Sequence, residues 1–182
     1  MLTRIRERRA RREQALQLHN SIVTQSREPL FYAELGVPDT MLGRYEMVCL
    51  HAYLVLMRLR RDRELRLAQT LHDLIFDDFD VALREAGLGD MGIGHRIKKL
   101  ARNLHGRISV YEVGLAGGDA EMAIILRRNM YASAEPNDAQ VAGMINYIRA
   151  ARRAVDEVKA VELLAGKPAF VSPIVQMGES KE

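Results

Sequence analysis

Hydrophobic and polar positions along this chain follow the periodicity of helices. Residues 41–61 are apolar almost all round a helical wheel, which is typical of a helix buried at the centre of a domain. Residues 64–86 place apolar side chains on one broad side and acidic side chains on the other, which predicts an amphipathic helix. Leu, Ala, Met and Arg are abundant and Pro is scarce. The 182 residues are therefore expected to form an all-α protein with a single compact multi-helix domain.

Capping and turn residues set the expected limits of the helices. Thr40 is a candidate N-cap for the central helix, and the stretch SREPLFYAELGVPDT before it is typical of a loop. Further helices are expected at residues 3–24, 93–105 and 120–131, the last with Asp119 as its cap. A final helix is expected from Asn137 or Asp138 to about residue 164. Residues 107–115 fit either a helix or a short strand. The expected parts are a basic N-terminal helical segment (1–28), a helical domain (29–165) and a short irregular C-terminal tail (166–182).

Positive charge is concentrated at the start of the chain. Residues 1–12 hold six Arg and one Glu, a balance of +5, which leaves −2 for the remainder because the whole chain carries +3. Dense arginine favours a phosphate-rich partner such as a ribosome, a nucleic acid or an anionic lipid surface, although a solvated helix end fits equally well. No aromatic residue is interleaved, so specific DNA reading is not expected. The candidate contact residues are Arg4, Arg6, Arg8, Arg9, Arg11 and Arg12.

Two features bear on the compartment. Cys49 is the only cysteine, so a disulfide framework and a cysteine-based zinc site are excluded and a reducing compartment is indicated. The longest strongly apolar stretch, Met47 to Met57, is too short to cross a bilayer. The N-terminal residues lack the apolar segment of a secretory signal.

The sequence HDLIFDDFD raises the question of a metal site or an active site. On a helical wheel Asp73, Asp77 and Asp80 lie on the side opposite the apolar residues, as expected for a solvated face. A metal-dependent hydrolase using His51, His72, Asp73 and Asp77 remains an alternative. Metal-binding spacings such as H-E-x-x-H are absent, however, and no catalytic residue, metal or cofactor is expected.

Other polar residues fall on apolar faces. His51 lies among apolar neighbours and is expected to be a core histidine, hydrogen-bonded to backbone or to a carboxylate. Asp78 points into the apolar side of residues 64–86, where a carboxylate needs a partner. It is expected to be paired in the core, with a catalytic or metal role and simple exposure as the alternatives. The expected buried polar network consists of His51, Arg58, Asp78, Glu85 and Arg107.

Several short motifs occur in a recognisable order. They are Val37-Pro38-Asp39-Thr40, Leu50-His51-Ala52-Tyr53, Arg58-Leu59, Phe76-Asp77-Asp78-Phe79-Asp80, Leu83-Arg84-Glu85-Ala86-Gly87, Gly89-Asp90, Arg96-Ile97-Lys98-Lys99-Leu100 and Gly106-Arg107. In this order the motifs resemble the ubiquinol–cytochrome c reductase chaperone family, over about residues 30–150.

The resemblance implies an assembly factor rather than an enzyme. Such a protein binds newly made cytochrome b or its assembly intermediates and supports biogenesis of the ubiquinol–cytochrome c reductase. A small partner protein and a position at the ribosome exit are also implied, as is a cytoplasmic location peripheral to the inner membrane. Besides the hydrolase, a ribosome- or nucleic-acid-binding adaptor acting through the arginine-rich start remains an alternative. A chaperone needs an exposed apolar surface, which the aliphatic composition allows.

Overall fold

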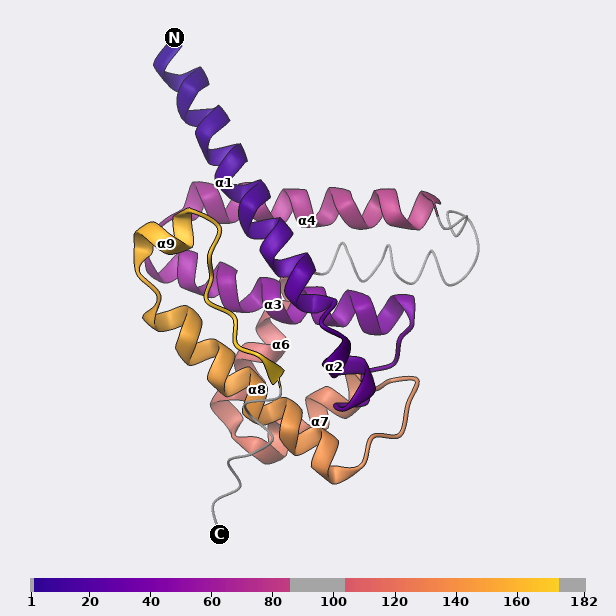
Figure 1. Ribbon diagram of the computed structural model, residues 1–182. Coiled ribbons are helices and arrows are strands. Elements are labelled where there is room, and N and C mark those ends of the chain that lie inside the picture. Colours follow the sequence, from indigo (N-terminus) through magenta and orange to yellow (C-terminus); the bar gives the residue numbers. More distant parts are fainter. Residues whose placement is uncertain (1, 86–103, 174–182) are drawn as a thin grey trace.

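The computed structural model describes residues 2–85 and 104–173, and every regular element within these ranges is a helix (Figure 1). The helices are α1 (Leu2–Ser26), α2 (Pro29–Ala33), α3 (Met41–Arg61), α4 (Leu65–Glu85), α6 (Leu104–Gly117), α7 (Asp119–Asn129), α8 (Asp138–Glu157) and α9 (Ala160–Leu164). The all-α prediction is confirmed. The glycine-rich turn after residue 86 and most of the helix expected at 93–105 lie outside the described residues.

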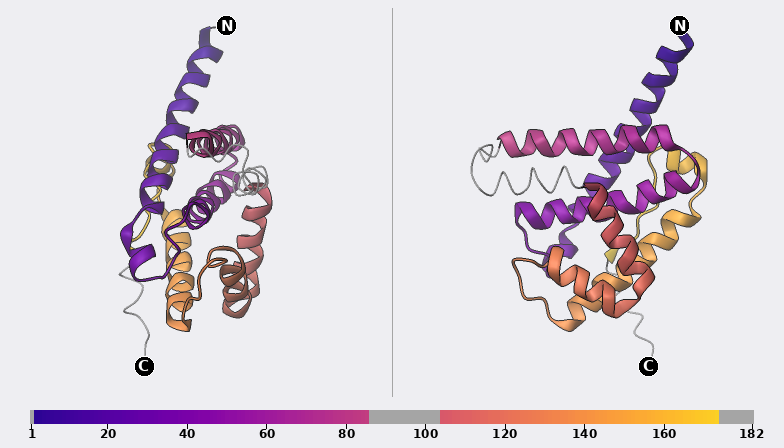
Figure 2. Two further views of the ribbon diagram at one scale, coloured as in Figure 1. Left: turned by 90° about the vertical axis from the view of Figure 1, so that its right-hand side faces the viewer. Right: turned by 180° about the vertical axis from the view of Figure 1, so that it is seen from behind.

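Helix α3 lies at the centre of the molecule. It contacts α1 and α4 on one side and α6 and α8 on the others, as Figures 1 and 2 show. Side chains all round it, such as Leu50 and Leu54, are fully buried, which explains its nearly continuous apolar sequence. Within the described ranges, none of the helices combines the length and apolar character needed to cross a bilayer.

Helix α1 has two unlike halves. Ala15, Leu18 and Ile22 are fully buried and pack its C-terminal half against α3 and α4. Residues 3–10 are exposed, and this half of the helix projects beyond the other helices (Figures 1 and 2). The change in packing follows the sequence, because the first half carries charged side chains and the second carries the apolar ones.

Helix α4 is amphipathic, as its pattern predicts. Leu67, Leu71 and Ile75 are buried against α1 and α3. Asp73 and Asp77 are exposed, so the acidic side of the helix faces solvent.

The caps fix two of the helix boundaries. Thr40 Oγ1 accepts a hydrogen bond from the Gly43 amide at 3.1 Å, and α3 covers the residues predicted. Asn137 forms a reciprocal capping box with Gln140 at the start of α8.

Other boundaries differ from the prediction. Residues 29–33 of the expected loop form α2, and residues 107–115 belong to α6. The predicted last helix is two helices, because Val158 adopts an extended conformation after α8 (φ −58°, ψ 140°). The N-cap of α7 is Gly118 rather than Asp119, which is the first helical residue.

The described part of the C-terminal tail packs on the domain. Ser21 Oγ donates to the Gly166 carbonyl at 2.5 Å, and Gln25 Nε2 donates to the Val171 carbonyl at 2.9 Å. The ring of Phe170 lies 5.0 Å from that of His51. Residues 166–173 are therefore an irregular segment held by α1 and α3, while residues 174–182 lie outside the description.

Candidate functional site

His51 is a fully buried side chain at the middle of α3. Its Nδ1 lies 2.8 Å from the Met47 carbonyl oxygen and 3.0 Å from Ser26 Oγ, and its Nε2 lies 2.6 Å from the Tyr147 hydroxyl. Burial lowers the pKa of His51 to about 4, partly offset by the bond to Met47. The ring is therefore neutral at pH 7.

The neutral ring fits one arrangement of protons. Nδ1–H donates to the Met47 carbonyl, and Nε2 accepts from the hydroxyl of Tyr147, which in turn accepts from Gln25 Nε2 at 3.2 Å. Through these bonds His51 links α1, α3 and α8. The predicted hydrogen bond from a core histidine to backbone is confirmed, and its structural role needs no charge.

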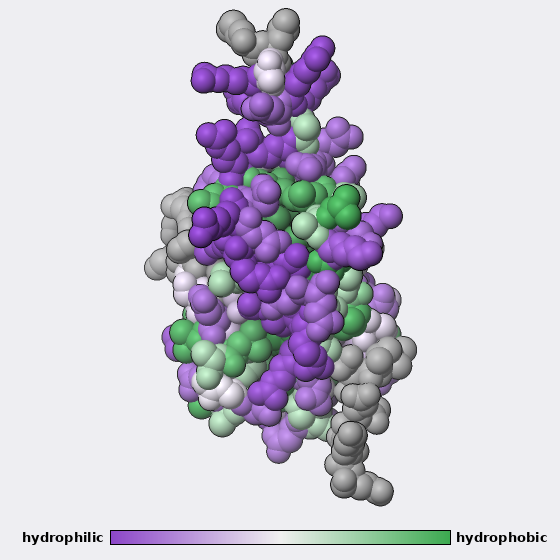
Figure 3. All heavy atoms as spheres, turned by 90° about the vertical axis from the view of Figure 1, so that its left-hand side faces the viewer, coloured by the Kyte–Doolittle hydropathy of each residue, from purple (hydrophilic) through white to green (hydrophobic). Residues whose placement is uncertain are grey.

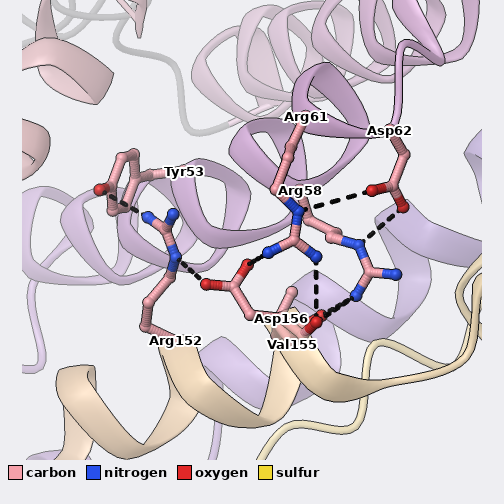
Figure 4. A network of polar contacts seen from close by, with 7 residues as sticks. All are labelled: Tyr53, Arg58, Arg61, Asp62, Arg152, Val155 and Asp156. Atoms are coloured by element: carbon pink, nitrogen blue, oxygen red, sulfur yellow. Dashed lines mark hydrogen bonds and ion pairs between the residues drawn. The ribbon is translucent and has the colours of Figure 1, made fainter.

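Arg58 is the second buried polar centre. Its Nε donates to Asp62 at 2.7 Å, and its Nη1 donates to the backbone carbonyls of Val155 and Asp156 at 2.7 and 2.8 Å. These carbonyls lie in the last turn of α8, where no further helical amide can reach them. Arg58 therefore caps α8 from α3 (Figure 4).

The contacts around Arg58 extend along the α3–α8 interface (Figure 4). Arg61 pairs with Asp156 at 3.0 Å, and Arg152 pairs with the same carboxylate at 2.7 Å. Arg152 also donates to the Tyr53 hydroxyl at 3.1 Å. The burial of Tyr53 raises the pKa of its hydroxyl, so this group stays protonated. The whole set holds α3 and α8 together.

The predicted single network is divided in the structure. His51 and Arg58 bind separate partners, and Asp78 is exposed over 57% of its side chain instead of buried. Asp78 lies 3.6 Å from His19 Nε2, a contact the sequence did not suggest. The expectation of a buried Asp78 is wrong, because Asp78 lines an open pocket at the side of α4 and is not covered by another helix. Glu85 and Arg107 lie in α4 and α6, but their side chains are outside the described residues.

The structure does not gather the residues of the hydrolase alternative. Asp73 lies 2.7 Å from Gln69 Nε2 and 3.4 Å from His72 on the exposed side of α4, whereas His51 is bound within the core. Among residues 2–85 and 104–173, no three His, Cys, Asp or Glu side chains lie close enough together to hold a metal ion.

A pocket of about 340 Å³ opens between α1, α3, α4 and the loop before α3. Its apolar lining includes Val23, Tyr45, Val48 and Phe79, and the rings of Tyr45 and Phe79 lie 4.7 Å apart. This volume and mixed lining suit the insertion of an apolar side chain or a small apolar group.

Exposed charges surround the apolar lining. They belong to Arg27, Asp39, Arg44 and Asp78. Arg44 donates to Asp39 at 2.6 Å, and this hydrogen bond lowers the pKa of the Asp39 carboxyl. The lining combines both signs of charge with an apolar interior, which suits a polypeptide better than a single ion.

Local signals for this pocket are present but partial. Phe79 stands next to Asp78, and Tyr45 follows Arg44, so aromatic and charged residues alternate on α3 and α4. Their convergence could not be predicted, because it depends on where α1 crosses the two helices.

The arginines of α1 form a separate basic surface. Arg4, Arg6, Arg8, Arg9 and Arg12 are exposed and Arg11 is half-buried. Arg8, Arg9, Arg11 and Arg12 share a groove with Asp73 and Asp77 of α4, whereas Arg4 and Arg6 do not line it.

Comparison with known proteins finds a matching family and several relatives of this chain. Residues 33–170 match the family described as "Ubiquinol-cytochrome C chaperone". The chain is 24% identical over 172 residues to "Protein CBP3, mitochondrial" of Saccharomyces cerevisiae, covering 91% of this chain and 51% of the relative. It is 19% identical over 164 residues to "Ubiquinol-cytochrome c reductase complex assembly factor 1" of Mus musculus, covering 89% and 56%.

A solved structure resembles the chain over nearly its whole length. The "Cbp3 homolog from Brucella abortus" superposes with a TM-score of 0.78 at 34% identity, covering 96% of this chain and 98% of that one. The chain spans about half the length of the curated relatives it matches. The family match begins at the last residue of α2 and covers all the later described helices, including the central helix with His51 and Arg58. On this basis the chain belongs to the ubiquinol-cytochrome C chaperone family.

Proposed function

We propose that this protein is an assembly factor of the ubiquinol–cytochrome c reductase and acts by binding newly made cytochrome b or an assembly intermediate that contains it. The observation that carries the proposal is the family match over residues 33–170. The names of the mouse and yeast relatives are consistent with it. The protein then works by holding its client and has no reaction to catalyse.

The pocket between α1, α3 and α4 is the proposed contact for the client. A membrane protein exposes apolar side chains before insertion, and Tyr45, Val48 and Phe79 offer them a partly desolvated site. The exposed charges of Arg27 and Asp78 can meet the polar groups at the ends of apolar client segments.

Deletion of the gene tests the function. We expect less cytochrome b, seen as a smaller haem b absorbance difference in membranes, and lower ubiquinol–cytochrome c reductase activity. Unchanged haem b spectra in the deletion strain would contradict the proposal.

Complementation of the deletion strain tests the pocket. Met41 lines the pocket and is partly exposed, so Met41→Asp should place a hydrated charge in its apolar lining and reduce recovery of cytochrome b. Ile124→Asp is the matched control, because Ile124 is 60% exposed on α7 and does not line the pocket. If both variants restore cytochrome b equally, the client binds elsewhere. Circular dichroism of each purified variant excludes a folding defect.

A further inference from the structure

One end of the molecule combines arginines with exposed aliphatic side chains. We call it the basic end and define it as residues 4–16 of α1 together with residues 63–66 at the start of α4. The two parts are adjacent, because Arg11 and Gln14 line one groove with Arg63, Leu65 and Arg66. In Figure 3 the α1 part forms a hydrophilic projection with an apolar area at its base.

The aliphatic side chains of this end are unusually open to solvent. Ile5 is 56% exposed, Leu16 42% and Leu65 62%. On α1 the positions of Ile5 and Leu16 are separated by eleven residues, about three helical turns, so both lie on one side of the helix. Arg9 and Arg12 lie between them on the same side, and both line the groove that holds Asp73 and Asp77, as Ile5 does. This side of the helix therefore alternates aliphatic and cationic groups.

The alternation of cationic and aliphatic side chains distinguishes RNA from a lipid surface as the phosphate-bearing partner. Guanidinium groups bind the phosphates of RNA and of lipid headgroups equally well. Exposed aliphatic side chains gain little beside a hydrated sugar–phosphate backbone, but they are stabilised at the boundary between headgroups and acyl chains. Residues 4–16 contain no aromatic side chain for stacking on bases. The combination favours a membrane surface over RNA.

We propose that the basic end docks on the surface of an anionic lipid bilayer. Arg4 and Arg6, which lie outside the groove that holds Asp73 and Asp77, make the main contacts with headgroup phosphates, and Ile5, Leu16 and Leu65 enter the interface without spanning it. The proposal goes beyond the assembly function and does not depend on the identity of the client. It also places the protein where a membrane-protein client is inserted.

Vesicle flotation of the purified protein tests the docking. Vesicles of phosphatidylcholine containing phosphatidylglycerol should carry the protein to the top of a density gradient, and pure phosphatidylcholine vesicles should not. Binding should weaken steeply between about 50 and 500 mM salt, because screening shortens the reach of surface charges. Failure to float with the anionic vesicles would overturn the proposal.

Paired variants locate the surface. Arg4→Gln with Arg6→Gln leaves the groove facing Asp73 and Asp77 intact and should weaken vesicle binding roughly tenfold or more. Arg127→Gln with Arg128→Gln removes the same charge from the last turn of α7 and should leave binding unchanged. Equal weakening by the two pairs would show a non-specific charge effect and overturn the assignment.

A third variant separates lipid from RNA. Ile5→Ser with Leu65→Ser keeps every charge but should also weaken vesicle binding several-fold, because the buried apolar area is lost. A duplex RNA with the same phosphate content as the vesicles serves as competitor. If this variant binds vesicles like the unmodified protein and the RNA displaces the protein from them, the partner is RNA and the proposal fails.

Discussion

His51 gives up its hydration on folding without gaining a charged partner, so its protonation links stability to pH. The pKa in the folded chain is about 4, below the ordinary value of 6.5, and the unfolded chain therefore binds the proton more tightly. We expect full stability above pH 6.5 and a progressive loss as the pH falls from 6.5 to about 4, amounting to roughly 3 kcal/mol for this residue. Urea unfolding at several pH values measures the loss.

Substitution isolates the contribution of His51. His51→Gln should lower stability at pH 7 by about 1–2 kcal/mol through altered packing, but should flatten the dependence on pH below 6.5. His72→Gln, on the outer side of α4, should retain the dependence. An equally steep pH dependence in His51→Gln would mean that other groups cause it.

Arg58 should matter more for stability than the arginine three residues later. Arg58→Ala leaves the Val155 carbonyl without its donor, and it leaves the Asp156 carbonyl and the Asp62 carboxylate with only the partly exposed Arg61 as a partner. We expect a loss of about 3 kcal/mol in the free energy of unfolding. Urea denaturation at pH 7 measures it.

Two further substitutions test whether the buried, forked contacts of Arg58 cause this loss. Arg61 is 50% exposed while it pairs with Asp156, so Arg61→Ala should cost no more than about 1 kcal/mol. Arg58→Lys keeps the charge but cannot reproduce the forked contacts, and should fall between the two. A loss in Arg58→Lys as small as that in Arg61→Ala would mean that charge alone is sufficient.

The sequence predicts whether these residues are buried better than it predicts which residues they bind. An uninterrupted apolar stretch around His51 is enough to predict a core histidine. Its partners Ser26 and Tyr147 are 25 and 96 residues away, and no local pattern indicates them. The prediction that Asp78 is buried was wrong for a different reason. A helical wheel gives the direction of a side chain, but it does not show whether another helix covers that side chain.

The start of α8 depends on a capping box that can be tested alone. Asn137→Ala removes the acceptor for the Gln140 amide and should cost about 1 kcal/mol, measured by thermal or urea unfolding. Asn137→Ser retains a capping oxygen and should cost much less. Equal losses for the two variants would indicate that packing of Asn137, rather than the cap, sets its contribution.

Element boundaries were predictable where a local signal fixes them. Thr40 and Asn137 have side chains that satisfy free helical amides, and both caps occur where the sequence places them. The end of α8 was not predictable, because its terminal carbonyls are satisfied by Arg58 from a distant helix. Residues 107–115 had no such signal, and their contacts with α3 and α7 stabilise the helix.

For the whole molecule, composition and periodicity predict the all-α class, but the pocket emerges only from the tertiary arrangement. Val23, Tyr45 and Phe79 come from three helices whose crossing no single segment determines. The motif order in residues 30–150 nevertheless indicated the family, since it extends across several helices and does not depend on their contacts.

The two halves of α1 should differ in local stability by most of the global free energy of unfolding. The C-terminal half has Leu18 and Ile22 fully buried, so opening it exposes core surface. Residues 4–12 have no comparable packing, and a helical segment this short is marginal in water. Hydrogen exchange followed by mass spectrometry should therefore find fast exchange at residues 4–12 and protection close to the global value at 16–26. Uniform protection along α1 would mean that the projecting half is packed in solution, against a second copy or against the body. Fast exchange in both halves would instead support the predicted division of the chain at residue 28.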